Sequence, residues 1–110
     1  MSKRRINSER LNQRITLQTN APGRGDDGSE TPSWSDTATI WAEKSHKSSR
    51  EFFAAQRINT EITDLFIVRY RPNVTTLMRV KYGDRYYSIV GASDPDGRQR
   101  ELYLLCKEVV

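Results

Sequence analysis

Apolar and polar residues alternate in several short segments of this chain, and turn-forming residues separate the segments. Alternation with a period of two is typical of β-strands that are buried on one face. The segments are residues 14–19, 34–45, 61–71, 78–82, 85–90 and 100–109. The sequence therefore predicts a mainly β protein, a small antiparallel β-barrel or sandwich of about six strands.

One segment between the strands has a helical pattern instead. Ser48 or Ser49 can cap a short helix over about residues 49–57, because serine oxygen accepts a hydrogen bond from a free N–H group of the first turn. Phe52 and Phe53 supply the apolar side of this helix. A helix of about two turns is not stable alone in water. We therefore expect it to pack on the rest of the protein, at an open end of the barrel.

Residues 20–33 interrupt the strand pattern with a long polar segment. They include three glycines and two prolines but no large apolar side chain. Such a segment buries too little apolar surface to offset the entropy lost on ordering. We expect a mobile loop without stable contacts in the free subunit, and an early target for proteases. Loops of this length in small domains are often functional.

Length and composition predict one small domain with a mild basic bias. The chain has 110 residues, 35% of them hydrophobic, and a formal net charge of +4. We divide it into a basic N-terminal arm, residues 1–12, and a barrel, residues 13–110. The lone cysteine fits a reducing cytoplasm. No apolar run reaches the roughly 18 residues that span a bilayer, so we expect no membrane association. No apolar stretch follows the basic N-terminus, so we expect no secretory signal.

Residues that carry most enzyme and metal chemistry are scarce. His46 and Cys106 are the only histidine and the only cysteine, and two ligands do not make a zinc site. His46 comes at the end of a strand, next to Lys47, and is expected at the surface. Cys106 shares a strand face with Leu102 and Leu104, so we expect a buried thiol. We predict no enzyme activity, no metal and no cofactor.

Aromatic and basic residues are interleaved in residues 69–71 and 79–87. On a small barrel, such residues can stack the bases of single-stranded nucleic acid and contact its phosphates. The same alternation is also typical of ordinary strands, with aromatic rings in the core and charges in water. A barrel that binds single-stranded nucleic acid therefore remains an alternative function.

The order of these elements resembles the head-tail joining family of long-tailed bacteriophages and prophages, whose members are also called head closure or stopper proteins. The likeness covers nearly the whole chain from about Leu11, and it rests on the ordered set rather than on one motif. The N-terminal segment, the first ten residues, is longer and more basic than expected for this family. The matching pieces are residues 11–18 (LNQRITLQ), the polar loop leading to Trp34, 38–42 (ATIWA), 50–56 (REFFAAQ), 66–72 (FIVRYRP), 78–83 (MRVKYG) and 100–109 (RELYLLCKEV).

The resemblance implies a structural virion protein. It implies a small β-barrel with a short helix and a mobile loop, monomeric when free and assembled into a ring, a dodecamer, in the connector. The ring binds below the portal and its adaptor, closes the DNA exit channel and offers a docking surface to tail proteins. The protein would be present in the host cytoplasm during assembly and then in the virion. A tail-terminator-like protein of the same assembly is a further alternative.

Two groups of residues are candidates for these contacts. The first group, for assembly or for closing the channel, comprises Gly23, Arg24, Gly25, Asp26, Asp27, Gly28, His46, Lys47 and Arg50. The second group, for facing DNA, comprises Lys3, Arg4, Arg5, Arg10 and Arg14. A ring multiplies the charge of each subunit, so a weak basic bias becomes a strong field that acts on phosphates without reading the bases.

Overall fold

The computed structural model describes residues 10–20, 23–24, 30–31 and 33–109. Within this part, no helix has the length and apolar character needed to cross a membrane. The elements, in chain order, are β1 (Gln13–Asn20), β2 (Gly23–Arg24), β3 (Glu30–Thr31), β4 (Trp34–Lys44), α1 (Arg50–Ile58), β5 (Asp64–Arg69), β6 (Met78–Tyr82), β7 (Arg85–Ser93) and β8 (Glu101–Val109).

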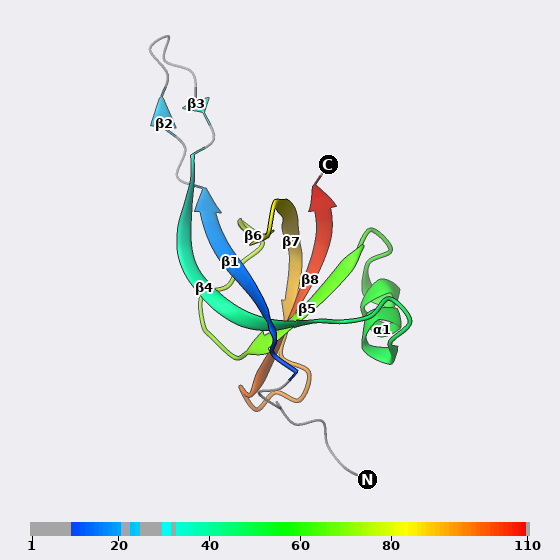
Figure 1. Ribbon diagram of the computed structural model, residues 1–110. Helices are drawn as coiled ribbons and strands as arrows, with labels where there is room; N and C mark the ends of the chain where they lie inside the picture. The colour runs from blue at the N-terminus through cyan, green and yellow to red at the C-terminus, as the bar shows by residue number, and fades with distance from the viewer. Residues whose placement is uncertain (1–9, 21–22, 25–29, 32, 110) are drawn as a thin grey trace.

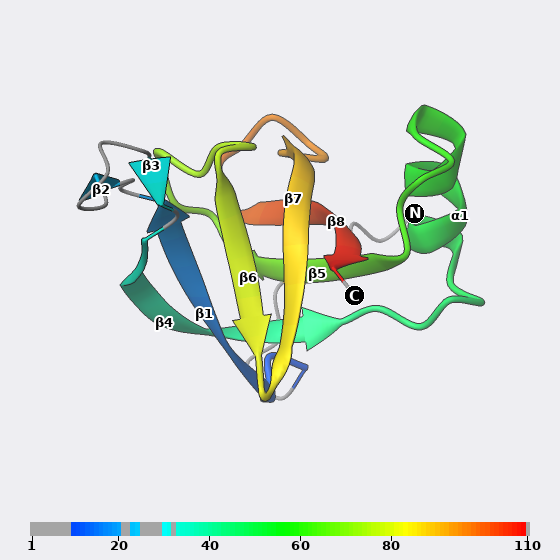
Figure 2. The ribbon, with the colours of Figure 1, turned by 90° about the horizontal axis from the view of Figure 1, so that it is seen from above.

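Six antiparallel strands close into a barrel in the order β1-β4-β5-β8-β7-β6, which confirms the predicted mainly β fold with one short helix (Figures 1 and 2). The closing contact is the pairing of β1 with β6, over residues 16–19 and 78–81. A tight turn joins β6 to β7, and Gly83 adopts a φ of 62° there, which glycine accommodates without steric cost. Closure leaves the barrel strands few free edges.

The interior of the barrel is filled by the apolar residues of the alternating pattern. Phe66 and Tyr87 pack edge to face at its centre, with ring centroids 5.2 Å apart. Their neighbours come from every barrel strand: Ile15, Leu17, Ala42, Val68, Met78, Val80, Ile89, Leu102, Leu104 and Cys106. Burial of this set supplies the main hydrophobic stabilisation of the fold.

Helix α1 packs on the outer wall of the barrel, so its predicted place at an open end is wrong. Strand β5 is buried on both faces, because Phe66 points into the barrel while Leu65 and Ile67 point outward beneath the helix. Phe52 and Ala55 of α1 cover these outward side chains. A two-faced apolar strand needs a cover on its outer side, and the helix provides it.

The strand predicted over residues 61–71 is shorter in the structure. Strand β5 begins at Asp64, because residues 59–62 form a turn in which the Ile62 N–H donates to the Asn59 carbonyl. Ile62, inside the predicted strand, packs with the helix, whereas Phe66 of β5 lies in the barrel core. Alternation cannot distinguish a strand residue from one in the turn before it.

Strands β1 and β4 continue beyond the barrel as a hairpin that ends in β2 and β3 (Figure 1). Asn20 is paired with Trp34, and β2 then pairs with β3. The expectation of a loop without stable contacts over residues 20–33 is therefore wrong for the described part. Ladder hydrogen bonds join backbone groups and need no apolar side chain, so composition did not reveal them. Residues 25–29 lie outside the described residues.

Candidate assembly surfaces

The described residues include few side chains suited to metal or thiol chemistry. None of them form a group of three or more His, Cys, Asp or Glu side chains that could hold a metal ion. His46 is exposed and Cys106 is buried, as the sequence predicted. Burial, and then the negative charge of Asp64, raise the pKa of the Cys106 thiol well above its ordinary value. A thiol that stays protonated is a poor nucleophile.

A stacked arginine lies at the base of the hairpin. The Arg79 guanidinium lies between two aromatic rings, 4.2 Å from the centroid of Trp34 and 4.1 Å from that of Tyr86. These residues come from β6, β4 and β7, on the outer side of the barrel. Cation–π contacts of this kind are stronger when the cation is partly shielded from water.

Two hydrogen bonds hold the same arginine in place. Its Nε donates to Oε1 of Gln18 at 2.7 Å, and Nε2 of Gln18 donates to Oδ1 of Asp36 at 2.8 Å. Gln18 is 6% exposed, which is low for a polar side chain. Buried polar chains with satisfied hydrogen bonds favour one arrangement of the backbone that carries them. This chain of contacts therefore sets the direction in which the hairpin leaves the barrel.

Helix α1 begins at a well-defined cap. Ser49 accepts a hydrogen bond from the Phe52 N–H through its side-chain oxygen, at 3.1 Å. The hydroxyls of Ser45 and Ser49 are 2.7 Å apart, which ties the cap to the end of β4. Glu51 lies in the first turn and Arg57 in the last, where each charge suits the helix dipole. The short helix is thus held at its start as well as by packing.

The outer face of α1 combines exposed apolar and basic side chains. Phe53 is 53% exposed and Ile58 is 75% exposed. Arg50 and Arg57 flank Phe53 in an open hollow of about 730 Å³. Neighbouring apolar and arginine side chains at a surface are typical of protein interfaces.

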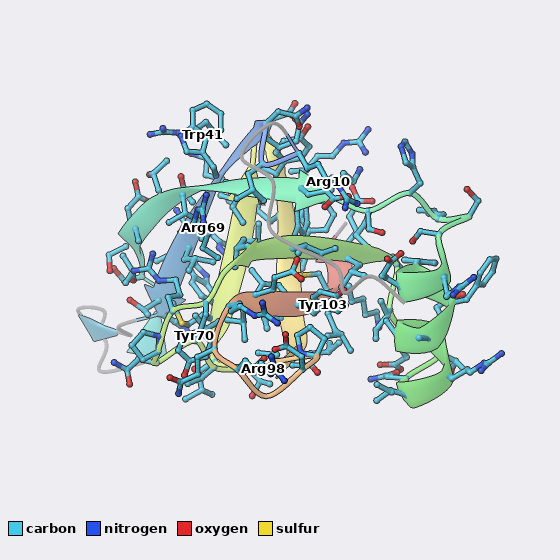
Figure 3. The ribbon with its side chains drawn as sticks, turned by 90° about the horizontal axis from the view of Figure 1, so that it is seen from below. Arg10, Trp41, Arg69, Tyr70, Arg98 and Tyr103 are labelled. Carbon is cyan, nitrogen blue, oxygen red and sulfur yellow. The ribbon has the colours of Figure 1, made fainter. Side chains whose placement is uncertain are left out.

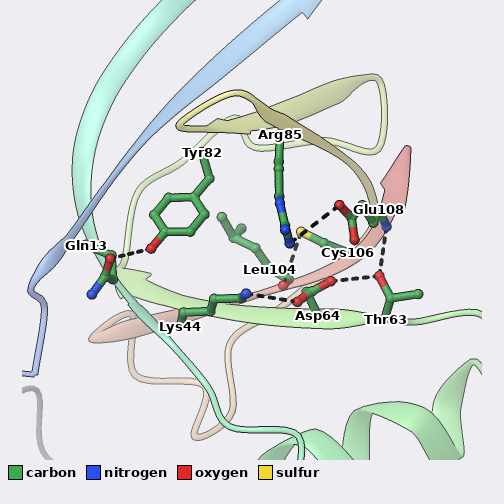
Figure 4. A network of polar contacts seen from close by, with 9 residues as sticks. All are labelled: Gln13, Lys44, Thr63, Asp64, Tyr82, Arg85, Leu104, Cys106 and Glu108. Atoms are coloured by element: carbon green, nitrogen blue, oxygen red, sulfur yellow. Dashed lines mark hydrogen bonds and ion pairs between the residues drawn. The ribbon is translucent and has the colours of Figure 1, made fainter. Parts of the chain in front are cut away.

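Polar side chains, not the helix, fill one end of the barrel interior (Figure 4). Nζ of Lys44 lies 3.5 Å from Oδ1 of Asp64, and the Thr63 hydroxyl donates to the other oxygen of Asp64 at 2.8 Å. Arg85 forms a longer ion pair with Glu108, at 3.9 Å. The positive and negative charges in this group balance, so this end of the barrel carries little net charge.

The structure places the predicted assembly residues in two separate regions. Gly23 and Arg24 form β2, in the hairpin. His46 and Lys47 are exposed between β4 and α1, and Arg50 is the first helical residue. The hairpin and the helix lie on different sides of the barrel (Figures 1 and 2). Seven residues of the two predicted groups lie outside the described part: Lys3, Arg4, Arg5, Gly25, Asp26, Asp27 and Gly28.

Two predicted DNA-facing arginines belong to the barrel surface. Nη2 of Arg10 lies 2.7 Å from Oε2 of Glu43. Arg14 is part of β1, and its guanidinium lies 4.7 Å from the ring centroid of Trp41. Strand pairing holds the backbone of Arg14 in the barrel wall, as the strand predicted over residues 14–19 requires. Sequence reasoning also missed the Arg79 stack, because Trp34 lies far along the chain from the β6–β7 hairpin that carries Arg79 and Tyr86.

Comparisons with known proteins agree with this architecture. The model of a family described as phage head completion protein matches residues 6–109. A search of curated proteins found no match.

Two solved structures resemble the chain over nearly their whole length. The solution structure of protein SF1141 from Shigella flexneri 2a has 31% sequence identity and a TM-score of 0.70, and the match covers 94% of this chain and 96% of that one. A chain from the virion of a native gene transfer agent particle has 21% identity and a TM-score of 0.63, with 92% and 97% covered. At that identity the second likeness shows a shared fold.

Proposed function

Because the chain belongs to the phage head completion protein family, it is a structural protein of a virion, and we propose that it is a subunit of the head-tail connector ring. The ring binds below the portal and adaptor, closes the DNA exit channel and presents the surface on which the tail docks. The subunit is a monomer when free, in the host cytoplasm, and becomes part of a homo-oligomeric ring, a dodecamer, on assembly.

The observation that best supports this proposal is the hairpin held out from a closed barrel (Figure 1). The described core of the barrel is built from residues of the six barrel strands. The Arg79 stack nevertheless fixes the base of the hairpin. An extended element that leaves the barrel from a fixed base suits contact with neighbouring subunits or with a channel.

The hairpin can be tested by shortening it. We expect a variant in which Asn-Gly replaces residues 21–33 to fold, since the Asn20–Trp34 pair and the barrel remain, and Asn-Gly forms a tight two-residue hairpin turn. In a phage or prophage that lacks its own copy of the gene, this variant should produce DNA-filled heads that leak DNA and carry no tails. The measurements are electron microscopy of the particles and the titre of infectious phage.

The control retains the length of the hairpin and changes residues 25–29 to glycine and serine, which separates the role of length from that of sequence. Infectious particles at the normal titre from the shortened variant would contradict a role for the hairpin. Tails of irregular length on intact heads would instead favour the tail-terminator-like alternative.

Contact with packaged DNA is tested by removing the basic arm. We expect the free monomer to bind DNA weakly, without preference for base sequence, and to lose this binding as salt rises, because a monomer meets few phosphates at once. Removing residues 2–10 should leave the fold unchanged and weaken the salt dependence. The measurement is fluorescence anisotropy with single-stranded and duplex DNA. Tight, base-dependent binding would favour the single-stranded nucleic-acid alternative.

A further inference from the structure

Strand β4 has a long backbone edge that no other described strand uses. Its pairing with β1 extends from Trp34 to Ala42, but its pairing with β5 covers only residues 42–44. The two strands then separate, as Figure 2 shows. Among the described residues, no strand pairs with the β5-facing edge of residues 34–41.

Such an edge presents N–H and C=O groups at alternate residues, ready to pair with an added strand. Natural proteins often protect long edges with a charge, a proline or a covering loop. Residues 35–40 of β4 include one charged residue, Asp36, and its side chain accepts a hydrogen bond from Gln18. Among the described residues, the edge therefore lacks the usual protection against pairing.

A groove of about 360 Å³ lies where β4 and β5 separate. Thr39, Ile40 and Trp41 line its β4 side, residues 69–71 line its β5 side, and Leu11 completes it. Trp41 is 50% exposed, whereas Leu11 is 8% exposed. The groove thus offers apolar surface beside an unused backbone edge. Figure 3 shows Trp41, Arg69 and Tyr70 on the same face of the barrel.

The charged residues that line this groove are arginines. Arg69 and Arg71 line it directly, and Arg14 stacks on Trp41 at its rim. The nearby carboxylate of Glu43 is bound by Arg10. Carboxylates on an incoming strand would therefore find arginine partners, and arginine binds carboxylates through two parallel hydrogen bonds. Lysines on such a strand would be repelled.

We propose that this groove binds an extended acidic segment of a neighbouring protein, which pairs with the free edge of β4 and places its carboxylates against Arg69 and Arg71. The inference rests on the proposed function for the presence of that neighbour in the virion. Backbone pairing supplies affinity in this binding mode, and the side chains beside the edge select the partner. The basic N-terminal arm of the chain itself does not fit this charge.

The test uses the isolated full-length chain and a capped peptide in which valine and glutamate alternate over about eight residues, the length of the free edge. We expect NMR shift changes confined to residues 34–41 and 69–71, and slower amide exchange along the free edge of β4. A peptide with lysine in place of glutamate should bind at least about tenfold more weakly. A peptide N-methylated at alternate residues should lose binding, because it cannot pair with the edge.

Two variants reverse the charge of arginines, one in the groove and one, as the control, on α1. The double variant Arg69→Glu/Arg71→Glu should prefer the lysine peptide, while Arg57→Glu, on the exposed face of α1, should behave like the original chain. Equal binding of the acidic and basic peptides, shifts centred on α1, or no shifts at millimolar peptide would overturn the proposal. The peptide test needs no ring, so a negative result does not contradict the connector proposal. Failure of the hairpin test likewise does not contradict the proposal that this groove binds an acidic segment.

Discussion

Replacing Phe52 with alanine should lower the free energy of unfolding by roughly 3–5 kcal/mol, the range observed when a buried phenylalanine is truncated. Phe52 is 3% exposed and packs with Leu65, Ile67 and Leu105 on the outer wall of the barrel. The substitution removes the side chain that anchors α1 and leaves a cavity over β5. Most small domains have only about 5–15 kcal/mol of stability. Urea denaturation followed by circular dichroism measures the change.

The neighbouring phenylalanine is the matched control. Phe53 is 53% exposed on the opposite face of α1, so Phe53→Ala should change the free energy of unfolding by about 0.5 kcal/mol or less. We expect this variant to fold and to show any defect only in assembled particles. If Phe52→Ala were as stable as the original chain, the assignment of the helix to the structural core would be wrong.

Cys106 should react with an aromatic disulfide reagent on the order of 10³-fold or more slowly in the native chain than in the denatured chain. The side chain is 0% exposed in the barrel core and its thiol faces the Leu104 carbonyl, 3.5 Å away. A reagent can reach it only through opening of the barrel, and unfolded fractions of folded proteins are about 10⁻³ to 10⁻⁶. The release of the coloured thiol measures the rate. Reaction at the denatured rate would mean that β8 opens locally.

The raised pKa of the Cys106 thiol also gives stability a pH dependence. The unfolded chain releases this proton near the ordinary cysteine pKa of about 8.5, whereas the folded chain retains it to higher pH. Unfolding therefore releases a proton above about pH 8.5. The stability contributed by the buried, protonated thiol is complete below that pH and decreases as pH rises. Urea denaturation of the original chain and of Cys106→Ala, from pH 7 to 10, gives the free energy of unfolding of each. The difference between the two free energies isolates the contribution of the thiol. A difference in free energy that does not change with pH would contradict the assignment of Cys106 to the buried core.

Local pattern in the sequence was enough to identify the six barrel strands, the short helix and most of the inward-facing residues. Alternation placed Leu102, Leu104 and Cys106 together, and all three lie in the barrel core. Ser49 caps a helix that ends at Ile58, close to the predicted boundary. These features depend on residues within a few positions of one another, because side-chain direction repeats every two residues in a strand and hydrogen bonds cap a helix within one turn. The family resemblance rested on the order of the same elements.

Contacts between distant parts of the chain were decided only by the tertiary structure. The polar end of the barrel unites Lys44, Asp64 and Glu108 from β4, β5 and β8, and the Arg79 stack unites side chains from β4, β6 and β7. No local period encodes which strands become neighbours, since that choice depends on closing the barrel and covering both faces of β5. The groove beside Trp41 exists because β4 and β5 pair over only residues 42–44 and then separate. The sequence by itself determined the strands, the helix and the buried face, while barrel closure decided which edges and charges remained available to a partner.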